Sequence, residues 1–244
     1  MFMCFDSIYE WNTKWFSVSE STVLRLGRHM MSDSMKHKNI VIFGGTGQTG
    51  MELVRQGLTA GYNVRVLARS PEKSKRLPKG VDVQIGDATN PDAVSAALQN
   101  QDAVLCAVGG QGLRDSTTRT TITKIIVEEM QKQSIQRLIV CSVVGIGESS
   151  SHLGWFSRLV TGFFLKHAMA DHRNQEDIVK NSGLDVVVFR PPQLVNGEKT
   201  ESYNLAKATE DFSATKVCRA DVAHAMIRAL EEDTWLGSFL SISS

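Results

Sequence analysis

The sequence predicts an α/β domain built around a doubly wound parallel sheet, and three observations lead to that fold class. Short apolar runs alternate with segments of helical periodicity, the first run ends in a cluster of glycines, and no repeat or low-complexity tract interrupts this order after residue 38. Strands separated by helices imply right-handed crossovers and a sheet covered on both faces. We therefore expect one Rossmann-type domain over residues 38–244, preceded by a short N-terminal extension over residues 1–37.

Six apolar runs are the expected strands, because strands buried on both faces of a parallel sheet are nearly continuously hydrophobic. They cover residues 39–43, 64–68, 81–85, 103–108, 137–141 and 185–189. The clearest helical pattern between them spans residues 115–133, where Ile122, Ile125, Ile126 and Met130 recur at helical spacing.

The first run leads directly into the motif Gly45-x-Gly47-x-x-Gly50, which is followed by an apolar helix face. In this setting of strand, tight turn and helix, free amide groups and the positive end of the helix dipole suit a pyrophosphate. Glycines that serve only close packing are the alternative, and both flanks of the motif count against it. The expected cofactor contacts here are Gly44, Gly45, Thr46, Gly47, Gln48 and Thr49.

Composition limits the other classes of function. A chain of 244 residues with 42% hydrophobic and 22% charged residues is long enough for one α/β domain and too short for two ordinary ones. A net charge of +1 gives no electrostatic reason to expect nucleic acid or an acidic membrane as a partner. The four cysteines lie far apart with no C-x-x-C pair, and the histidines show no ligand spacing, so we expect a reduced, intracellular protein without a metal site.

The first 37 residues differ from the rest of the chain. They are rich in Met and Ser, contain Trp11, Trp15 and Phe16, and show neither a secretory segment nor an apolar run long enough to span a bilayer. The preferred interpretation is a poorly ordered extension. A presequence, a segment that docks on the domain, and an alternative start at Met31 or Met35 stay open.

Polar residues follow the second and third strands at the sheet edge where a cofactor would lie. Arg69 ends the second strand, where NAD-selective proteins usually place an acidic residue for the ribose hydroxyls. An arginine fork pairs instead with a 2′-phosphate, so the sequence favours NADPH over NADH, with a solvated surface arginine as the alternative. Asp87 follows the third strand, where it would accept from the adenine amino group or cap the helix that starts after Pro91.

The fourth run leads into Val108-Gly109-Gly110, where the missing side chains of the two glycines would let the cofactor ribose approach the backbone; a flexible loop is the alternative. The next segment, residues 111–119, would cross the cofactor, with Arg114 and Arg119 near its phosphates. The fifth run ends in Ser142, whose hydroxyl is the best candidate for a group beside the nicotinamide. A capping serine is the alternative there.

Several of these features occur together and in a fixed order along the chain. They are the turn Gly44 to Gly50, Arg69, Gly86-Asp87, Ser142, Asp171-His172, Ser182-Gly183-Leu184 and Pro191-Pro192. Together they resemble the flavin reductase (NADPH), or biliverdin reductase B, family, an atypical short-chain dehydrogenase/reductase group with an NmrA-like NAD(P)-binding domain. The resemblance covers roughly residues 38–243. It implies an NADPH-dependent, monomeric, cytoplasmic reductase of flavins, biliverdin or related tetrapyrroles.

The same resemblance assigns roles to individual residues. Ser142 matches the family's active-site serine, His172 matches a histidine near the substrate pocket, and Pro191 falls among the cofactor contacts. The family's second histidine, after the paired prolines, is Gln193 here, which puts tetrapyrrole reduction in doubt. The region 143–168, with its aromatic residues, is more apolar than the family pattern and would either reshape the pocket or pack on the sheet.

Alcohol dehydrogenation is not expected, because a Tyr-x-x-x-Lys pair after the fifth strand is missing. Tyr203 and Lys207 have that spacing but follow the sixth strand, so we interpret them as a coincidence. The expected reaction is hydride transfer from NADPH to a flat conjugated small-molecule acceptor, with Ser142 bonding the acceptor or the carboxamide and His172 assisting protonation or lining the rim. The alternatives are a non-catalytic NADP(H)-binding sensor or scaffold protein, and a quinone or isoflavone-type reductase.

Overall fold

A computed structural model describes residues 36–110, 117–146, 166–207, 210, 212–213 and 215–244. The elements, in chain order, are β1 (Asn39–Phe43), α2 (Gln48–Ala60), β2 (Asn63–Ala68), α3 (Pro71–Ser74), β3 (Asp82–Ile85), α4 (Pro91–Leu98), β4 (Ala103–Cys106), α5 (Thr118–Lys132), β5 (Arg137–Cys141), α7 (Lys166–Lys180), β6 (Asp185–Arg190), β7 (Gln193–Val195), β8 (Asn204–Lys207), β9 (Lys216–Cys218), α8 (Arg219–Arg228), a 3-10 turn η2 (Asp233–Trp235) and β10 (Ser238–Ser243). No helix in the described part of the chain is both long and apolar enough to cross a bilayer.

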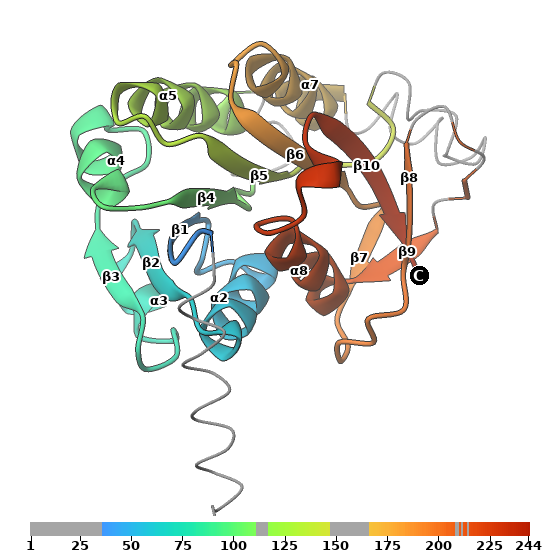
Figure 1. Ribbon diagram of the computed structural model, residues 1–244, viewed down its shortest axis with the longest axis horizontal. Helices are drawn as coiled ribbons and strands as arrows, with labels where there is room; N and C mark the ends of the chain where they lie inside the picture. The colour runs from blue at the N-terminus through green and yellow to red at the C-terminus, as the bar shows by residue number, and fades with distance from the viewer. Residues whose placement is uncertain (1–35, 111–116, 147–165, 208–209, 211, 214) are drawn as a thin grey trace, which may run out of the picture.

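The main sheet has eight strands in the order β3-β2-β1-β4-β5-β6-β10-β8 (Figure 1). Strands β1 to β6 and β10 run parallel, and β8 pairs antiparallel with β10 at one edge. The chain moves outward from β1 to β3, then returns to place β4 on the other side of β1. This order confirms the doubly wound Rossmann fold, and it puts the topological switch point between β1 and β4.

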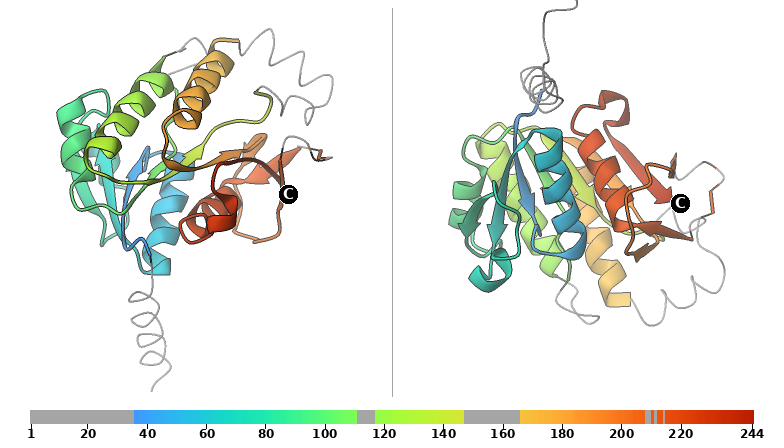
Figure 2. Two further views of the ribbon diagram at one scale, coloured as in Figure 1. Left: turned by 45° about the horizontal axis from the view of Figure 1, so that its top comes forward. Right: turned by 90° about the horizontal axis from the view of Figure 1, so that it is seen from below.

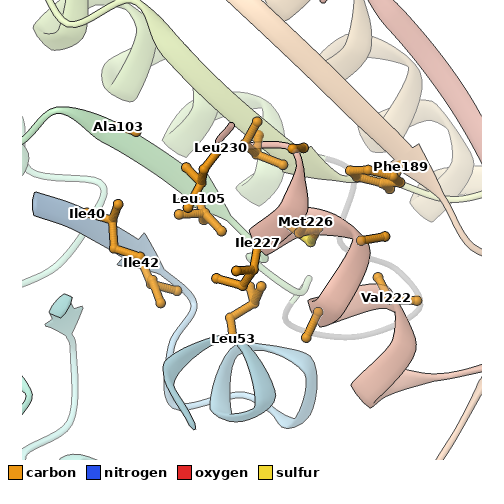
Figure 3. Packing of buried hydrophobic residues seen from close by; sticks show 14 of the residues in the cluster. Ile40, Ile42, Leu53, Ala103, Leu105, Phe189, Val222, Met226, Ile227 and Leu230 are labelled. Atoms are coloured by element: carbon orange, nitrogen blue, oxygen red, sulfur yellow. The ribbon is translucent and has the colours of Figure 1, made fainter. Parts of the chain in front are cut away.

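Helices cover both faces of the sheet. Helices α2 and α8 pack side by side on one face, and α4, α5 and α7 pack on the other (Figures 1 and 2). The alternation of side chains along β1 explains the two layers: Ile40 and Ile42 enter the core under α2 and α8, and Val41 and Phe43 enter the core under α4, α5 and α7. Figure 3 shows the first of these cores between the sheet and the two helices, with Leu53 of α2 in it.

The six predicted strands are all present, and their ends differ from the prediction by at most one residue in every strand but the fourth. The fourth strand was expected over residues 103–108, but β4 ends at Cys106. Strand β1 ends at Phe43, whose carbonyl accepts the amide of Ala107, so the pairing stops there and Val108 belongs to a loop. Of the predicted helix 115–133, the described part is α5, and the expectations for residues 1–35, 111–116 and 147–165 lie outside the described residues.

Two residues expected in the extension belong to the folded part. The Lys36 amide donates to Glu231 Oε2 over 3.3 Å, and the Lys36 ammonium pairs with Asp233. The Nε2 of His37 accepts from Arg137 Nε over 3.4 Å. The described contacts of the domain therefore include Lys36 and His37, which lie before the predicted boundary.

Candidate cofactor and substrate site

The glycine turn between β1 and α2 is shaped by close packing. Gly44 has a φ of +81°, and a Cβ at this position would lie 2.5 Å from the carbonyl oxygen of Ala107. A Cβ on Gly50, inside α2, would collide with the Gly44 carbonyl. Two of the glycines are thus required for packing, as the alternative interpretation of the motif expected in part. Through Gly44 and Gly50 the turn packs against Ala107, which follows β4, and α2 packs against the turn.

The same turn leaves the N-terminus of α2 open. Gly47 is its N-cap and makes no side-chain capping bond, and the first turn contains no acidic residue. Gly47 and Gln48 are exposed, and Thr49 is half-buried. Uncapped amides at the positive end of a helix dipole bind an anion well, so this turn fits the pyrophosphate of a dinucleotide.

A cavity of about 330 Å³ lies at the carboxyl ends of β1, β4, β5 and β6. Its lining comprises Gly47, Gln48, Thr49, Ala107, Val108, Gly109, Arg119, Cys141, Ser142, Val143, His172, Pro191, Pro192, Leu194 and Arg219. Nine of these positions were expected at the site from the sequence: Gly47, Gln48, Thr49, Val108, Gly109, Arg119, Ser142, His172 and Pro191. Gly44, Gly45 and Thr46 form the adjoining turn and are not among the lining residues.

Ser142 and His172 meet inside this cavity. Ser142 follows β5, its amide donates to the Phe189 carbonyl over 2.8 Å, and Val144 N donates to Pro191 O over 3.0 Å. The chain after β5 therefore continues along β6 and fixes the direction of the serine. The Ser142 hydroxyl lies 3.4 Å from Nδ1 of His172 on α7. This contact joins two residues 30 positions apart that the sequence named separately.

The surroundings of His172 keep it neutral. Burial, and after it the positive charge of Arg119, lower its pKa from 6.5 to about 3, although Asp171 and a bond with Gln175 oppose the shift. At neutral pH the imidazole is therefore uncharged, and it is not a ready source of protons. It can bond the Ser142 hydroxyl as either donor or acceptor, depending on its tautomer.

Arg119 brings a positive charge to the cavity wall, and Asp171 holds it there. The Arg119 guanidinium donates from Nη1 to Asp171 Oδ2 over 3.3 Å. Its Nε is buried without a hydrogen-bond partner among the described residues. A buried, unpaired donor on a residue that lines the cavity suits an anionic or carbonyl-bearing ligand. Arg119 thus lies in the cavity as the sequence suggested, whereas Arg114 is outside the described residues.

A buried ion pair anchors the other wall of the cavity. Arg190, the last residue of β6, donates from Nε to Glu176 Oε1 over 3.1 Å and from Nη2 to Glu176 Oε2 over 2.7 Å. Both side chains are buried, and the guanidinium lies 5.0 Å from the ring centre of Phe239. The pair connects α7 to the end of β6, one residue before Pro191, so it fixes the position of His172 relative to Pro191 and Pro192 in the cavity lining.

Arg69 and Asp87 lie at the ends of β2 and β3, outside the lining of this cavity. Arg69 is exposed, and its charge contributes to lowering the pKa of Asp87. The larger cause is Thr89, whose amide and hydroxyl both donate to Asp87 Oδ1, over 2.9 and 2.8 Å. The capping role considered for Asp87 is wrong, because Asn90 caps α4 through its bond from Asp92 N over 2.9 Å. Its adenine role stays a prediction.

The sequence did not identify several lining residues. Ala107, Cys141, Val143, Pro192 and Leu194 are apolar or weakly polar and carry no chemical signal of their own. Burial raises the pKa of the Cys141 thiol to about 12, so it is protonated at neutral pH and is not a nucleophile. Arg219 could have been noticed only through the pairing of β7 with β9, which brings a distant segment to the end of β6.

The Tyr203-x-x-x-Lys207 pair lies away from this site. The Tyr203 hydroxyl is 3.0 Å from Nδ1 of His224 on α8, and neither Tyr203 nor Lys207 lines the cavity. This geometry agrees with the interpretation of the pair as a coincidence.

Comparisons with known proteins agree with this geometry. The family described as NAD(P)H-binding matches residues 44–233. An uncharacterized chloroplastic protein of Arabidopsis thaliana is 26% identical over 232 residues, covering 91% of this chain and 82% of the relative. The photosystem II assembly factor Ycf39 of Synechocystis is 29% identical over 117 residues, covering 45% of this chain and 35% of that protein.

A solved structure gives the same fold. ChuY of Escherichia coli O157:H7, described as an anaerobillin reductase, superposes with a TM-score of 0.70 at 23% identity, covering 84% of this chain and 96% of that one. With the family match over most of the chain, the sheet order and the open glycine turn, the protein belongs to the NAD(P)H-binding family and has a Rossmann fold.

Proposed function

We propose that the protein is an NADPH-dependent reductase that transfers a hydride to a flat conjugated acceptor, a flavin first and a biliverdin-type tetrapyrrole second. The observation that carries the proposal is the meeting of Ser142, neutral His172 and Arg119 in one cavity beside an open helix N-terminus. A bound NADPH would supply the hydride, which is two electrons and one proton.

The chain's own groups suit an acceptor that needs charge stabilisation more than a strong acid. Ser142 can donate a hydrogen bond to an acceptor carbonyl or to the carboxamide, with His172 Nδ1 orienting the hydroxyl. The positive charge of Arg119 stabilises negative charge that develops on the acceptor. A conjugated ring spreads that charge, and solvent can deliver the second proton.

The titratable residues that line the cavity do not suit the oxidation of a simple alcohol. That reaction needs a positioned base for the hydroxyl proton, usually the tyrosine of a Tyr-Lys pair. Among the described lining residues no tyrosine or lysine is present, and Ser142 and His172 are both uncharged at neutral pH.

Flavin is the preferred acceptor because of the residue at position 193. The family that the sequence resembles has a histidine at this position, whereas this chain has Gln193, an exposed and neutral amide in β7. Leu194, the next residue, lines the cavity, so no histidine is available there for a tetrapyrrole. ChuY is described as a reductase of anaerobillin, and this is what keeps biliverdin-like acceptors in the proposal.

NADPH is the proposed cofactor because Arg69 lies exposed at the end of β2, where its charge acts on Asp87. We expect Arg69→Asp to weaken NADPH binding about a hundredfold while leaving NADH binding within about threefold, since a charged pair with phosphate is lost and a repulsion is added. Lys79→Asp, which reverses a charge on the exposed turn before β3, is the control. Equal weakening of both cofactors would contradict the 2′-phosphate assignment.

A second function from another class is a cofactor-binding scaffold or sensor that turns nothing over. The relationship to Ycf39, whose name describes an assembly factor, favours it, although this chain spans only about a third of that protein. A quinone or isoflavone-type reductase would share the cofactor and differ in the acceptor.

One experiment separates these functions. Purified protein is mixed with NADPH and an excess of FMN, riboflavin, biliverdin, a quinone or dichlorophenolindophenol, and NADPH absorbance is followed. Oxidation with flavin above the protein-free rate supports the proposal, and fastest turnover with a quinone supports the third function. Tight NADPH binding with no oxidation by any acceptor supports the scaffold and contradicts the reductase.

We further propose that the protein acts on its small-molecule substrate as a monomer, without nucleic acid or membrane, in the cytoplasm. The widely spaced cysteines and the near-zero net charge support this setting. A plastid is the competing location, since the name of the Arabidopsis relative places that protein in the chloroplast. Light scattering after size exclusion measures the mass, and fractionation of cells measures the location.

A further inference from the structure

Arg219, the first residue of α8, lies at the edge of the cavity beyond the end of β6. It follows β9, whose Cys218 pairs with Val195 of β7, so the register brings Arg219 next to Asn196. The guanidinium donates from Nη1 to Asn196 Oδ1 over 2.8 Å, and the side chain lines the cavity together with Leu194.

The backbone that carries Arg219 is firmly held. Asp221, fully buried in the first turn of α8, accepts the amides of Thr200 and Glu201 over 2.8 and 2.9 Å. Gln56 of α2 donates to the carbonyl of Ala220 over 2.8 Å. The start of α8 is thus fixed to both α2 and the loop after β7, and Arg219 extends from a rigid base.

The charge of Arg219 differs in kind from that of Arg119. The Arg119 guanidinium is paired with the carboxylate of Asp171, whereas the described hydrogen-bond partner of Arg219 is the neutral amide of Asn196. Among the described residues that line the cavity there is no carboxylate. Arg219 therefore places a positive charge at the rim that a bound anion could neutralise.

The sheet order indicates which ligand this charge would meet. The glycine turn follows β1, and in the main sheet β4 and β5 lie between β1 and β6. Arg219 contacts Asn196, in the segment that follows β6 and β7, so it lines the cavity from the β6 side, where Pro191, Pro192 and Leu194 also lie. We propose that Arg219 is a specificity-determining residue that binds an anionic group, a phosphate or a carboxylate, of the acceptor.

This inference rests on the proposed function, because it assumes that an acceptor binds at this end of the cavity. It goes further in that it defines a class of substrate: conjugated acceptors with an anionic substituent should be preferred over their neutral counterparts. FMN and riboflavin form a matched pair for the test, since they share the ring system and differ by a phosphate.

The experiment compares wild-type protein with Arg219→Gln, Arg219→Lys and the control Arg55→Gln, which removes an exposed arginine from α2 whose described partner is Glu52. Flavin fluorescence titrations in the presence of NADP+ measure binding, and steady-state rates give kcat and KM. We expect Arg219→Gln to raise the Kd and KM for FMN about tenfold, with riboflavin and kcat within about twofold. Arg219→Lys should recover part of the loss, and Arg55→Gln should behave as wild type.

Several outcomes would overturn the assignment. The anion contact is contradicted if Arg219→Gln raises the Kd for FMN and for riboflavin equally. It is also contradicted if wild-type protein binds the two flavins equally well. A rise in the KM for NADPH instead of FMN assigns Arg219 to the cofactor and not to the acceptor. Failure of the reductase activity itself would show as FMN binding without NADPH oxidation, and the fluorescence titration would still decide the role of Arg219.

Discussion

At the scale of single residues, the site depends on a hydroxyl and an imidazole that are both uncharged. The 3.4 Å contact between Ser142 and His172 is long for a hydrogen bond of this type, and such contacts in ligand-free sites often shorten when a ligand binds. Because His172 is neutral, we expect it to orient the serine and not to supply a proton.

Replacing Ser142 with Ala should lower kcat about tenfold to a hundredfold and leave NADP+ binding within about twofold. The reason is that a donor to developing charge is lost, whereas the pyrophosphate turn is untouched. Stopped-flow rates and a titration with NADP+ measure the two quantities. The control is Ser182→Ala, which lies just beyond the C-terminal end of α7. An unchanged kcat in Ser142→Ala would show that Ser142 has only a structural role.

His172 should also make the fold sensitive to acid. Its pKa is about 3 in the folded protein and near 6.5 when unfolded, so between these values the unfolded chain binds the extra proton and stability falls as pH decreases. At pH 5 the loss amounts to about 2 kcal/mol relative to neutral pH.

Urea unfolding at both pH values, with wild type and His172→Gln, measures this effect. The variant should lose about 2 kcal/mol less than wild type on acidification. His37 and His224, whose pKa values are also lowered, are present in both proteins, so the difference isolates His172. An identical loss in the two proteins would show that His172 titrates normally.

At the scale of elements, the start of α5 is capped by another helix. Its N-cap residue, Thr117, makes no side-chain capping bond. Instead Asp171 of α7, fully buried, accepts Arg119 N over 3.0 Å, Thr120 N over 2.9 Å and the Thr120 hydroxyl over 2.7 Å. One carboxylate thus satisfies the helix end, holds Arg119 at the cavity and locks α5 to α7.

Asp171→Asn should therefore cost about 2 kcal/mol of unfolding free energy, because the amide keeps one acceptor oxygen but loses the buried charge opposite Arg119. Urea unfolding measures the cost, and hydrogen exchange at the Thr120 amide should become faster. Asp177→Asn, an exposed position on the same helix, should change stability by less than about 0.5 kcal/mol. Equal costs for the two variants would show that α5 does not depend on this cap.

Some elements could not be predicted because their signals depend on partners far along the chain. The six parallel strands from β1 to β6 were found because most of them are short apolar runs, although β3, at the edge of the sheet, reads Asp-Val-Gln-Ile and is mainly exposed. Strand β10 reads Ser-Phe-Leu-Ser-Ile-Ser, and its serines at 238, 241 and 243 are buried in spite of their polarity. Strands β7 and β9 have three residues each and pair with each other, and three of the seven buried residues of α8 are alanines, which give a weak helical pattern.

At the scale of the whole molecule, the site also combines residues that a local sequence pattern reveals with residues that depend on distant parts of the chain. The glycine turn and Ser142 were predictable because each directly follows a strand. Arg219 and Asp171 were not assigned these roles, because one acts through the β7–β9 pairing and the other caps a helix 51 residues away. The cavity is a product of the sheet order, and its two arginines come from segments that local patterns do not connect.

The same sheet order separates the cavity from the start of the domain. Lys36, His37 and Lys38 lie before β1, at the edge of the sheet opposite the carboxyl ends where the cavity is. They contact the other half of the chain through Glu231, Asp233 and Arg137, and the Lys38 carbonyl accepts the amide of Asn63 over 2.9 Å. Changes at this edge should affect stability and leave ligand binding intact.

Two truncations test that separation. A protein that begins at Lys36 should keep the melting temperature and the NADP+ affinity of the full chain, because the sequence predicts that the residues before it are an extension outside the domain. One that begins at Asn39 loses the contacts of residues 36–38 and should melt a few degrees lower, roughly the effect of one or two hydrogen bonds, with unchanged affinity for NADP+. Calorimetry and a cofactor titration measure both quantities. If removal of residues 1–35 alone abolished NADP+ binding, the extension would be part of the functional domain and a domain boundary at Lys36 would be wrong.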